Sequence, residues 1–340
     1  MRALVITEHG PPEMLKVLEQ PDPQPGTGQV RIAVKAAGIN FADLMARVGL
    51  YQDAPKPPCV VGYEVAGEIE SVGDGVEGFS VGDRVMAPTK FGGYAELAVT
   101  PAADLVALPD GWSFEQGAAV PVVYATAYAA IVRYGALHAG ERVLVHAAAG
   151  GVGIAATQIA RKVGGEIFGT ASASKHDAIR GFGIDHAIDY RTQDFAKEVR
   201  RITGEETPLD LVVDGIGGAS FKKGYKLLRP GGRIVMLGAS AVMEGERRNI
   251  PRALRTVVTM PRFNPLTMMS SSRAAIGVNM LRIWQDKGSM MGEYGKPLTE
   301  LMADGTIQPV VAESFPLERG ADAHRYLAER RNVGKVVLTV

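Results

Sequence analysis

Residues 143–153 have the pattern of a buried strand that runs into a glycine turn and then opens a helix. The segment 142–146 is short and apolar, as in a strand covered on both faces of a parallel sheet. Small residues then occupy the three positions of the pattern G-x-G-x-x-G, with alanine in the first: Ala148, Gly150 and Gly153. Such a turn lets the backbone approach a pyrophosphate. A turn without a ligand is the alternative, and the strand-turn-helix context favours a dinucleotide site.

The backbone of this turn supplies the first expected contacts to the cofactor. They are Ala149, Gly150, Gly151, Val152 and Gly153. Apolar residues recur at helical spacing from Val152 to Val163, and Gly164 and Gly165 end the pattern. The free N–H groups and partial positive charge at the start of this helix would attract the phosphates.

The next hundred residues alternate between strand and helix patterns, as expected of a doubly wound sheet. Strands are expected at 166–171, 185–190, 209–214, 233–237 and 275–280, with helices at 175–182 and 221–228. Ligands bind beyond the carboxyl ends of strands in such sheets. Gly215 and Gly238, which follow two of these strands, should therefore border the same cleft.

The end of the second strand bears on which cofactor is used. NAD-selective sites place an acid about 20 residues past the glycine turn, but the sequence here is TASASK at 170–175. Hydroxyl and ammonium groups would hold a 2′-phosphate that a carboxylate would repel. Ser172 and Lys175 therefore favour NADPH, with Tyr190 and Arg191 as further contacts. Lys175 as a solvated helix residue is the alternative.

Composition argues against several other classes of protein. Lysine and arginine total 37 in 340 residues and are balanced by 37 acids, so no overall basic field favours nucleic acid or an anionic membrane. The single cysteine, Cys59, excludes an internal disulfide and a four-cysteine zinc site, and the six histidines form no close pair with ligand spacing. No signal peptide is recognised, and the longest apolar stretch, 117–132, is shorter than the roughly 20 residues of a membrane helix. We expect a cytoplasmic protein.

The first 120 residues have a different pattern from the middle of the chain. Short β-rich runs lie at 2–7, 29–37, 62–72, 84–87 and 93–99. Clusters of Pro and Gly separate them, which favours a compact, mostly antiparallel barrel or sandwich. Near the end, strand-like segments at 310–315 and 335–340 flank a helix at 321–329. We expect this tail to fold back onto the first domain, with the active cleft between the two domains.

Six motifs resemble, in order and spacing, those of the medium-chain dehydrogenase/reductase superfamily. They lie at 38–43, 49–51, 62–67, 81–85, 148–153 and 228–232. The resemblance is to the zinc-free quinone oxidoreductase branch. Within that branch, segments 169–176 and 332–336 resemble the vesicle amine transport protein homologues. The resemblance covers nearly the whole chain.

This resemblance implies an α/β fold with a GroES-like, β-rich catalytic domain and a doubly wound Rossmann domain. We place the catalytic domain at 1–124, the nucleotide-binding domain at 125–280, and a return segment that completes the catalytic domain at 281–340. The resemblance also implies NADPH as the cofactor and a homodimer formed through the edges of the Rossmann sheets.

One departure from the superfamily pattern is informative. Zinc alcohol dehydrogenases of the superfamily carry Gly-His-Glu, with the histidine as a catalytic ligand, where this chain has Gly62, Tyr63 and Glu64. Tyrosine cannot replace that imidazole in an ordinary zinc site. We therefore expect no metal, and only stoichiometric zinc in the purified protein would revive the alcohol dehydrogenase hypothesis.

Without a metal, reduction rests on positioning and on a hydrogen-bond donor. Tyr51 is the candidate donor, because a phenol is protonated at neutral pH and zinc-free relatives place a tyrosine here. Packing at the edge of the cleft is its alternative role. Asn40 and Asp43 match the motif Asn-x-x-Asp, whose Asn related reductases use near the nicotinamide ribose and substrate. The same pair would also cap a helix running to Arg47.

The resemblance implies three further cofactor contacts, and the substrate is less constrained. Thr126 would face the nicotinamide, while Arg330 would reach the 2′-phosphate close to Asn332. Methionine and phenylalanine side chains in 252–272 would line an adaptable apolar pocket or, as the alternative, fill a core or interface.

The leading hypothesis is a zinc-independent, NADPH-dependent reductase of quinones or α,β-unsaturated carbonyls, with enoyl thioesters also possible acceptors. The alternative is a nucleotide-binding protein with little turnover that acts in lipid, vesicle or nucleic-acid interactions. The reductase hypothesis, with a small-molecule substrate, involves no nucleic-acid partner and no membrane span.

Overall fold

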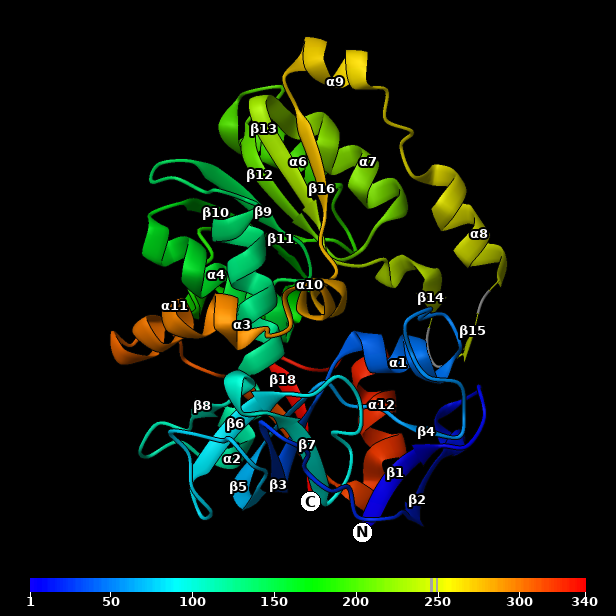
Figure 1. Cartoon of the computed structure of the whole chain (residues 1–340). Coiled ribbons are helices and arrows are strands. Elements are labelled where there is room, and N and C mark those ends of the chain that lie inside the picture. The colour runs from blue at the N-terminus through cyan, green and yellow to red at the C-terminus, as the bar shows by residue number, and fades with distance from the viewer. Residues whose placement is uncertain (245–246, 249) are drawn as a thin grey trace.

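The computed structural model describes residues 1–244, 247–248 and 250–340. Two bodies stand one above the other in Figure 1, one built on a helix-covered sheet and the other a β-rich body that holds both ends of the chain. Helices α3 (Pro121–Tyr128), α10 (Met280–Lys287) and α11 (Met291–Ala303) lie at the level where the two bodies meet. Among the described residues, no helix has both the length and the apolar character needed to cross a bilayer.

The helix-covered sheet has six parallel strands in the order β11-β10-β9-β12-β13-β16. When the six strands are numbered 1 to 6 in chain order, their order in the sheet is 3-2-1-4-5-6, that of the Rossmann fold. Its strands are β9 (Arg142–Val145), β10 (Glu166–Ala171), β11 (His186–Asp189), β12 (Leu209–Asp214), β13 (Leu228–Met236) and β16 (Ala274–Gly277). The expected doubly wound sheet is confirmed.

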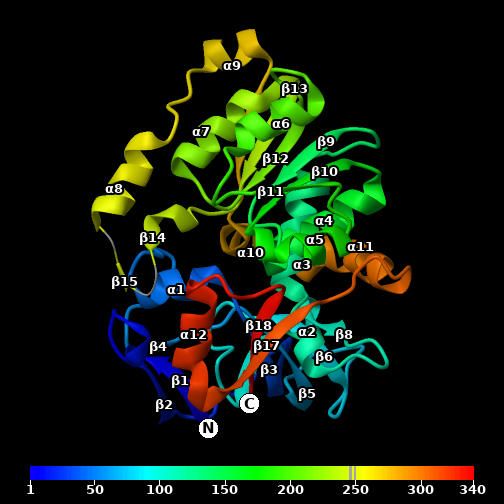
Figure 2. The same cartoon turned by 180° about the vertical axis from the view of Figure 1, so that it is seen from behind.

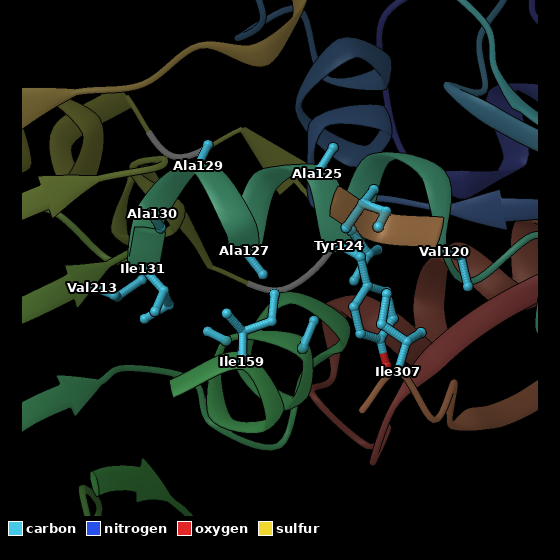
Figure 3. Packing of buried hydrophobic residues seen from close by; sticks show 14 of the residues in the cluster. Val120, Tyr124, Ala125, Ala127, Ala129, Ala130, Ile131, Ile159, Val213 and Ile307 are labelled. Atoms are coloured by element: carbon cyan, nitrogen blue, oxygen red, sulfur yellow. The ribbon is translucent and has the colours of Figure 1, made fainter. Parts of the chain in front are cut away.

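Helices cover both faces of this sheet, as the two opposite views in Figures 1 and 2 show. They are α4 (Gly151–Val163), α5 (His176–Gly181), α6 (Phe195–Thr203) and α7 (Gly218–Leu227). Helix α3 packs on α4 and buries a face of small residues, and Figure 3 shows Ala127 lying beside Ile159 of α4. Nearby, Tyr124 lies next to Ile307 in the same core.

The β-rich body contains a larger sheet in the order β17-β18-β3-β5-β6-β8, with β7 paired to β3, and a smaller sheet in the order β2-β1-β4. The larger sheet consists of β3 (Gln29–Ile39), β5 (Glu64–Val72), β6 (Arg84–Pro88), β7 (Leu97–Pro101), β8 (Val106–Ala107), β17 (Val311–Pro316) and β18 (Lys335–Thr339). The smaller one consists of β1 (Arg2–Ile6), β2 (Leu15–Glu19) and β4 (Cys59–Val60). Helices α1 (Phe41–Arg47), α2 (Phe114–Gly117) and α12 (Gly320–Ala328) complete the body.

The C-terminal strand β18 pairs antiparallel with β3, with Val336 opposite Ile39. The tail therefore returns to the first sheet as expected, and α12 packs against β17 and β18 (Figure 2). Trp284 of α10 and Tyr294 of α11 instead belong to the core that contains Val145 of the Rossmann sheet. The domain boundaries themselves remain a prediction.

The structure corrects several expected bounds. Strand β13 begins at Leu228 rather than 233, because Leu228 already pairs with Leu209 of β12. The register then shifts, and the Pro-Gly-Gly turn lies within β13 between Leu228 and Arg233, which pairs with Leu211. Met280 begins α10 instead of ending the sixth strand. Helix α6 was not anticipated, although Asp194 caps it through the backbone N–H groups of Ala196 and Lys197.

The segment with the expected apolar pocket forms two helices, α8 (Ile250–Thr259) and α9 (Pro265–Ser271). The ring of Phe263 packs edge-on against Phe221 and Tyr225 of α7. The sulfur of Met260 accepts a hydrogen bond from the Gly218 N–H, and Met269 is 71% exposed. The substrate pocket in this segment remains a prediction.

Candidate active site

The glycine turn after β9 brings helix α4 very close to the strand. A Cβ on Gly153 would collide with the carbonyl oxygen of Ala147 and would lie 2.7 Å from Cα of Ala148. Glycine is therefore required at the third motif position for close packing of helix and strand, as in dinucleotide-binding turns. Gly150 is the N-cap of α4, so the first N–H groups of the helix face the end of the sheet where a pyrophosphate would lie.

The loops that follow β12 and β13 lie side by side at the same end of the sheet. The backbone N–H of Ser240 donates to the carbonyl oxygen of Gly215 at 3.0 Å. Gly238, at the start of the second loop, would place a Cβ 3.6 Å from that same oxygen. The structure thus brings Gly215 and Gly238 together, as the strand pattern indicated.

A group of cations gathers at the end of β10, where the second strand was expected to meet a 2′-phosphate. Burial lowers the pKa of the Lys175 ammonium, and the charges of Arg191 and Arg330 act in the same direction, against the opposing effect of Tyr190. Burial also acts to raise the pKa of the Tyr190 phenol, but hydrogen bonds from the same two arginines outweigh it and lower that pKa. Ser172 is buried beside them. A dianionic phosphate would relieve the repulsion among these cations.

Lys175 is not a freely solvated helix residue. Its ammonium donates to the backbone carbonyl oxygens of Arg330 at 2.7 Å and Asn332 at 2.6 Å. The Asn332 side chain donates in turn to the carbonyl oxygen of Gly334 at 2.8 Å, and the Gly334 N–H donates to Ala149 in the glycine turn. The segment that leads into β18 therefore connects the two parts of the expected cofactor site.

Asn40 precedes helix α1 and carries two side-chain hydrogen bonds across the domain. Its amide Nδ2 donates to Glu64 Oε1 at 2.9 Å, and its Oδ1 accepts from Lys335 Nζ at 2.6 Å. Lys335 also donates to Glu64 Oε1 at 2.5 Å. Because one neighbour accepts and the other donates, the orientation of the Asn40 amide is fixed.

Glu64 and Lys335 form a buried ion pair that sequence reasoning did not assign. Glu64 has no exposed surface, and its Oε2 accepts the Val122 N–H of the first turn of α3 at 2.8 Å. Gly38 makes room for the pair, since a Cβ there would lie 2.8 Å from Glu64 Cγ and from Lys335 Cε. Gly38, Glu64 and Lys335 all lie in the motifs given above, but their residue types alone did not predict a role for them.

Asp43 is completely buried and holds the start of α1. Its two carboxylate oxygens accept the backbone N–H groups of Asn40 at 2.7 Å and Gly62 at 3.1 Å. Burial raises the pKa of Asp43 to about 7, against the opposing effects of these N–H groups, Tyr94 and Lys335. With no exposed surface, Asp43 is placed for the helix-capping role rather than for contact with a substrate.

Tyr51 follows α1 and is half-buried at the junction of the two hydrophobic cores. Its ring meets Tyr63 edge-on with centroids 6.1 Å apart. Burial, and then the charges of Asp53 and Asp43, raises the pKa of Tyr51 to about 12, so its phenol is protonated at neutral pH.

Thr126, the residue expected to face the nicotinamide, lies in α3, where its hydroxyl donates to the Val122 carbonyl oxygen at 2.6 Å.

Comparisons with known proteins agree with this geometry. The model "Alcohol dehydrogenase GroES-like domain" matches residues 26–110, and "Zinc-binding dehydrogenase" matches 182–338. The synaptic vesicle membrane protein VAT-1 homolog of Danio rerio is 39% identical over 340 residues, which cover 99% of this chain and 70% of that protein. The chain belongs to the medium-chain dehydrogenase/reductase superfamily.

Two solved structures of the superfamily have the same fold. The quinone oxidoreductase of Escherichia coli, complexed with NADPH, is 28% identical with a TM-score of 0.86 and covers 100% of both chains. The CurK enoyl reductase is 29% identical with a TM-score of 0.86, and the match covers 99% of this chain and 98% of that one. The superfamily is one of oxidoreductases, and the expected combination of a GroES-like and a Rossmann domain is confirmed.

Membership of this superfamily raises the question of a metal. Within the described parts of the chain, His, Cys, Asp and Glu side chains form no group of three or more that could hold a metal ion. At the catalytic zinc position of the superfamily, Tyr63 packs between Tyr51 and Phe91, with ring centroids 6.1 and 5.3 Å away. The residues at that position therefore do not provide the donor set of a zinc site.

Proposed function

We propose that this protein is a zinc-independent reductase that uses NADPH to reduce quinones or α,β-unsaturated carbonyls. The observation that carries the proposal is the cationic group formed by Lys175, Arg191 and Arg330 next to the buried Ser172. It lies at the end of β10, where NAD-selective sites place an acid. The NADPH complex of the related quinone oxidoreductase supports this choice of cofactor.

Residues of both domains would contribute to cofactor binding and to the reaction. The turn 149–153 would hold the pyrophosphate, and Arg330 and Lys175 the 2′-phosphate. Asn40, with its amide fixed by Glu64 and Lys335, would orient the nicotinamide ribose and the acceptor. When bound, NADPH would supply the hydride.

Tyr51 would donate a hydrogen bond to the acceptor oxygen as negative charge develops there. Its raised pKa keeps the proton on the phenol until that charge appears. A neutral donor in a partly buried cleft stabilises an oxyanion without the desolvation penalty of a charged residue. This arrangement suits quinones, enones and enoyl thioesters alike, because all of them develop charge on a carbonyl oxygen.

Substituting Tyr51 with phenylalanine tests the donor directly. We expect kcat/KM to fall by about a hundredfold, the effect of removing one oxyanion donor, while the Kd for NADPH is unchanged. Steady-state assays with 1,4-naphthoquinone, 9,10-phenanthrenequinone and short enones measure the effect. Equal kcat/KM for wild type and Tyr51→Phe with every acceptor would assign Tyr51 to packing. Wild-type protein that binds NADPH but turns over none of these acceptors would support a binding function instead.

Two neighbouring arginines provide a matched test of the cofactor choice. Arg330→Gln should weaken NADPH binding by about tenfold, the loss of one charge-assisted hydrogen bond, and leave NADH binding unchanged. Arg331→Gln is the control, because Arg331 instead lies 4.7 Å from the Tyr326 ring centroid and pairs with Glu329. Fluorescence titration with both coenzymes gives the constants. Equal losses for NADPH and NADH would contradict a 2′-phosphate contact at Arg330.

The assembly and location are part of the same proposal. Strand β16 lies at the edge of the Rossmann sheet, so a second copy could extend the sheet there into the expected homodimer. Sedimentation velocity on the purified chain would show whether it is dimeric. A small-molecule acceptor and a cytoplasmic location complete the proposed function.

A further inference from the structure

Asp53 connects the loop that carries Tyr51 to the nucleotide-binding domain. Arg282 of α10 donates to its two carboxylate oxygens, from Nη2 to Oδ1 at 2.7 Å and from Nε to Oδ2 at 3.3 Å. Asn279, the N-cap of α10, donates from Nδ2 to Oδ2 at 3.1 Å. Asp53 therefore accepts three hydrogen bonds from one helix start, two of them from a guanidinium that matches the carboxylate geometry.

Arg282 and Asn279, which donate hydrogen bonds to Asp53, are themselves held in place. Oδ1 of Asn279 accepts the backbone N–H of Arg282 at 3.2 Å, so the amide caps the helix while its Nδ2 reaches Asp53. Leu281 and Trp284 of the same helix are buried in the core. The helix start is thus anchored in the nucleotide-binding domain and gives the loop a fixed point of attachment.

The loop between Tyr51 and Asp53 is short and internally bonded. The backbone N–H of Ala54 donates to the Tyr51 carbonyl oxygen at 3.2 Å, and that of Leu50 donates to Met45 in α1 at 2.8 Å. Tyr51 therefore lies between one attachment on α1 and another on α10. The charge of Asp53 acts to raise the pKa of the Tyr51 phenol and that of Arg282 acts to lower it, after the larger effect of burial.

A second acidic residue makes a comparable connection elsewhere. Oδ1 of Asp104 accepts hydrogen bonds from the Ser289 hydroxyl at 2.8 Å and from the backbone N–H groups of Met290 at 2.7 Å and Met291 at 2.9 Å. Both connections therefore join the β-rich body to the segment 279–303. Asp104 follows β7, whereas Asp53 is two residues from Tyr51. The Asp104 connection is thus a natural comparison for the one at Asp53.

We propose that Asp53 is a positioning residue for Tyr51, held by Arg282 and Asn279 so that the Tyr51 loop stays fixed at the junction of the two domains, where the active cleft is expected. This inference rests on the proposed function for its effect on catalysis, but not for the position of the loop. An isosteric Asp53→Asn change would turn an NH₂ group toward donors on Arg282 and Asn279 and would remove the ionic attraction.

Hydrogen exchange measures the position of the loop without any turnover. Asp53→Asn should raise deuterium uptake in peptides covering 49–56, and Ser289→Ala, which removes one bond of the Asp104 connection, should leave those peptides unchanged. Exchange in 49–56 that is the same in wild type and Asp53→Asn would overturn the proposal. An equal increase in Ser289→Ala would overturn it too, because general loosening between the domains would then explain the change.

A double-mutant cycle tests whether Asp53 acts through Tyr51. Asp53→Asn should lower kcat/KM by about tenfold, a modest misplacement of a catalytic group, with the Kd for NADPH unchanged. In the Tyr51→Phe background it should have no further effect. Additive losses would overturn the proposal. Wild-type protein without turnover would instead refute the proposed function, and the exchange data would still decide whether Asp53 fixes the loop.

Discussion

Replacing Lys335 with methionine is expected to destabilise the protein by about 3–5 kcal/mol, the penalty of leaving one charge of a buried pair without its partner. Glu64 has no exposed surface and Lys335 is 4% exposed. Methionine keeps most of the aliphatic stem but removes the ammonium, so the Glu64 carboxylate loses its counter-ion and Asn40 loses a donor. Urea unfolding followed by fluorescence measures the change.

An exposed ion pair supplies the control for this substitution. Lys162 lies 2.8 Å from Asp304, with side chains 53% and 39% exposed. Lys162→Met should therefore destabilise the protein by no more than about 1 kcal/mol. The double variant Lys335→Met with Glu64→Gln should recover part of the loss, because no unpaired charge is left buried. Equal effects of the two lysine substitutions would show that the Glu64 carboxylate does not depend on Lys335.

Gly153→Ala is expected to weaken NADPH binding by about a hundredfold and to destabilise the protein by about 2 kcal/mol, within the range for overpacked cores. The added Cβ would collide with the Ala147 carbonyl oxygen and would lie 2.7 Å from Cα of Ala148. Helix α4 would have to move away from β9. Its first N–H groups, which are expected to bind the pyrophosphate, would move with it.

Gly151→Ala adds the same methyl group two residues earlier, keeps the backbone N–H through which residue 151 is expected to bind the pyrophosphate, and serves as the control. The atoms nearest to its Cβ would be side-chain atoms of Lys335 and Val123 at 3.6 Å, an ordinary contact distance. Alanine at this helical position should keep or slightly raise the melting temperature. Melting curves with and without NADPH, together with fluorescence titration, compare the variants. If both behave alike, close packing at Gly153 is not what maintains the cofactor site.

Local patterns in the sequence correctly placed much of the Rossmann domain. Strands β10 and β12 have the predicted bounds, because each is an apolar run that ends at turn residues. The helix after Asn40 ends at Arg47 as predicted. Such features depend on neighbouring residues, whose spacing alone sets the buried face and the caps.

The sequence missed elements whose stability comes from distant contacts. Helices α10 and α11 interrupt the return segment, and their buried face forms only against distant parts of the chain, namely the Rossmann core and, for α11, residues 102–107 of the β-rich body. Asp43 fits both a helix cap and a catalytic residue in the sequence, and its complete burial, which favours the cap, is seen only in the tertiary structure. Burial depends on the elements packed around a residue, which the sequence around it does not specify.

The sequence by itself determined the fold class, the glycine turn and the residue types that favour a 2′-phosphate. Only the tertiary structure decided which distant groups meet: Lys335 and Glu64 are 271 residues apart, Arg282 and Asp53 are 229 apart, and the Lys175 ammonium and the Arg330 carbonyl oxygen are 155 apart. The physical reason is that strand and helix patterns reflect contacts along a few turns of chain. Such contacts form because the chain returns to its first sheet through β18 and so brings residues that are distant in the sequence together.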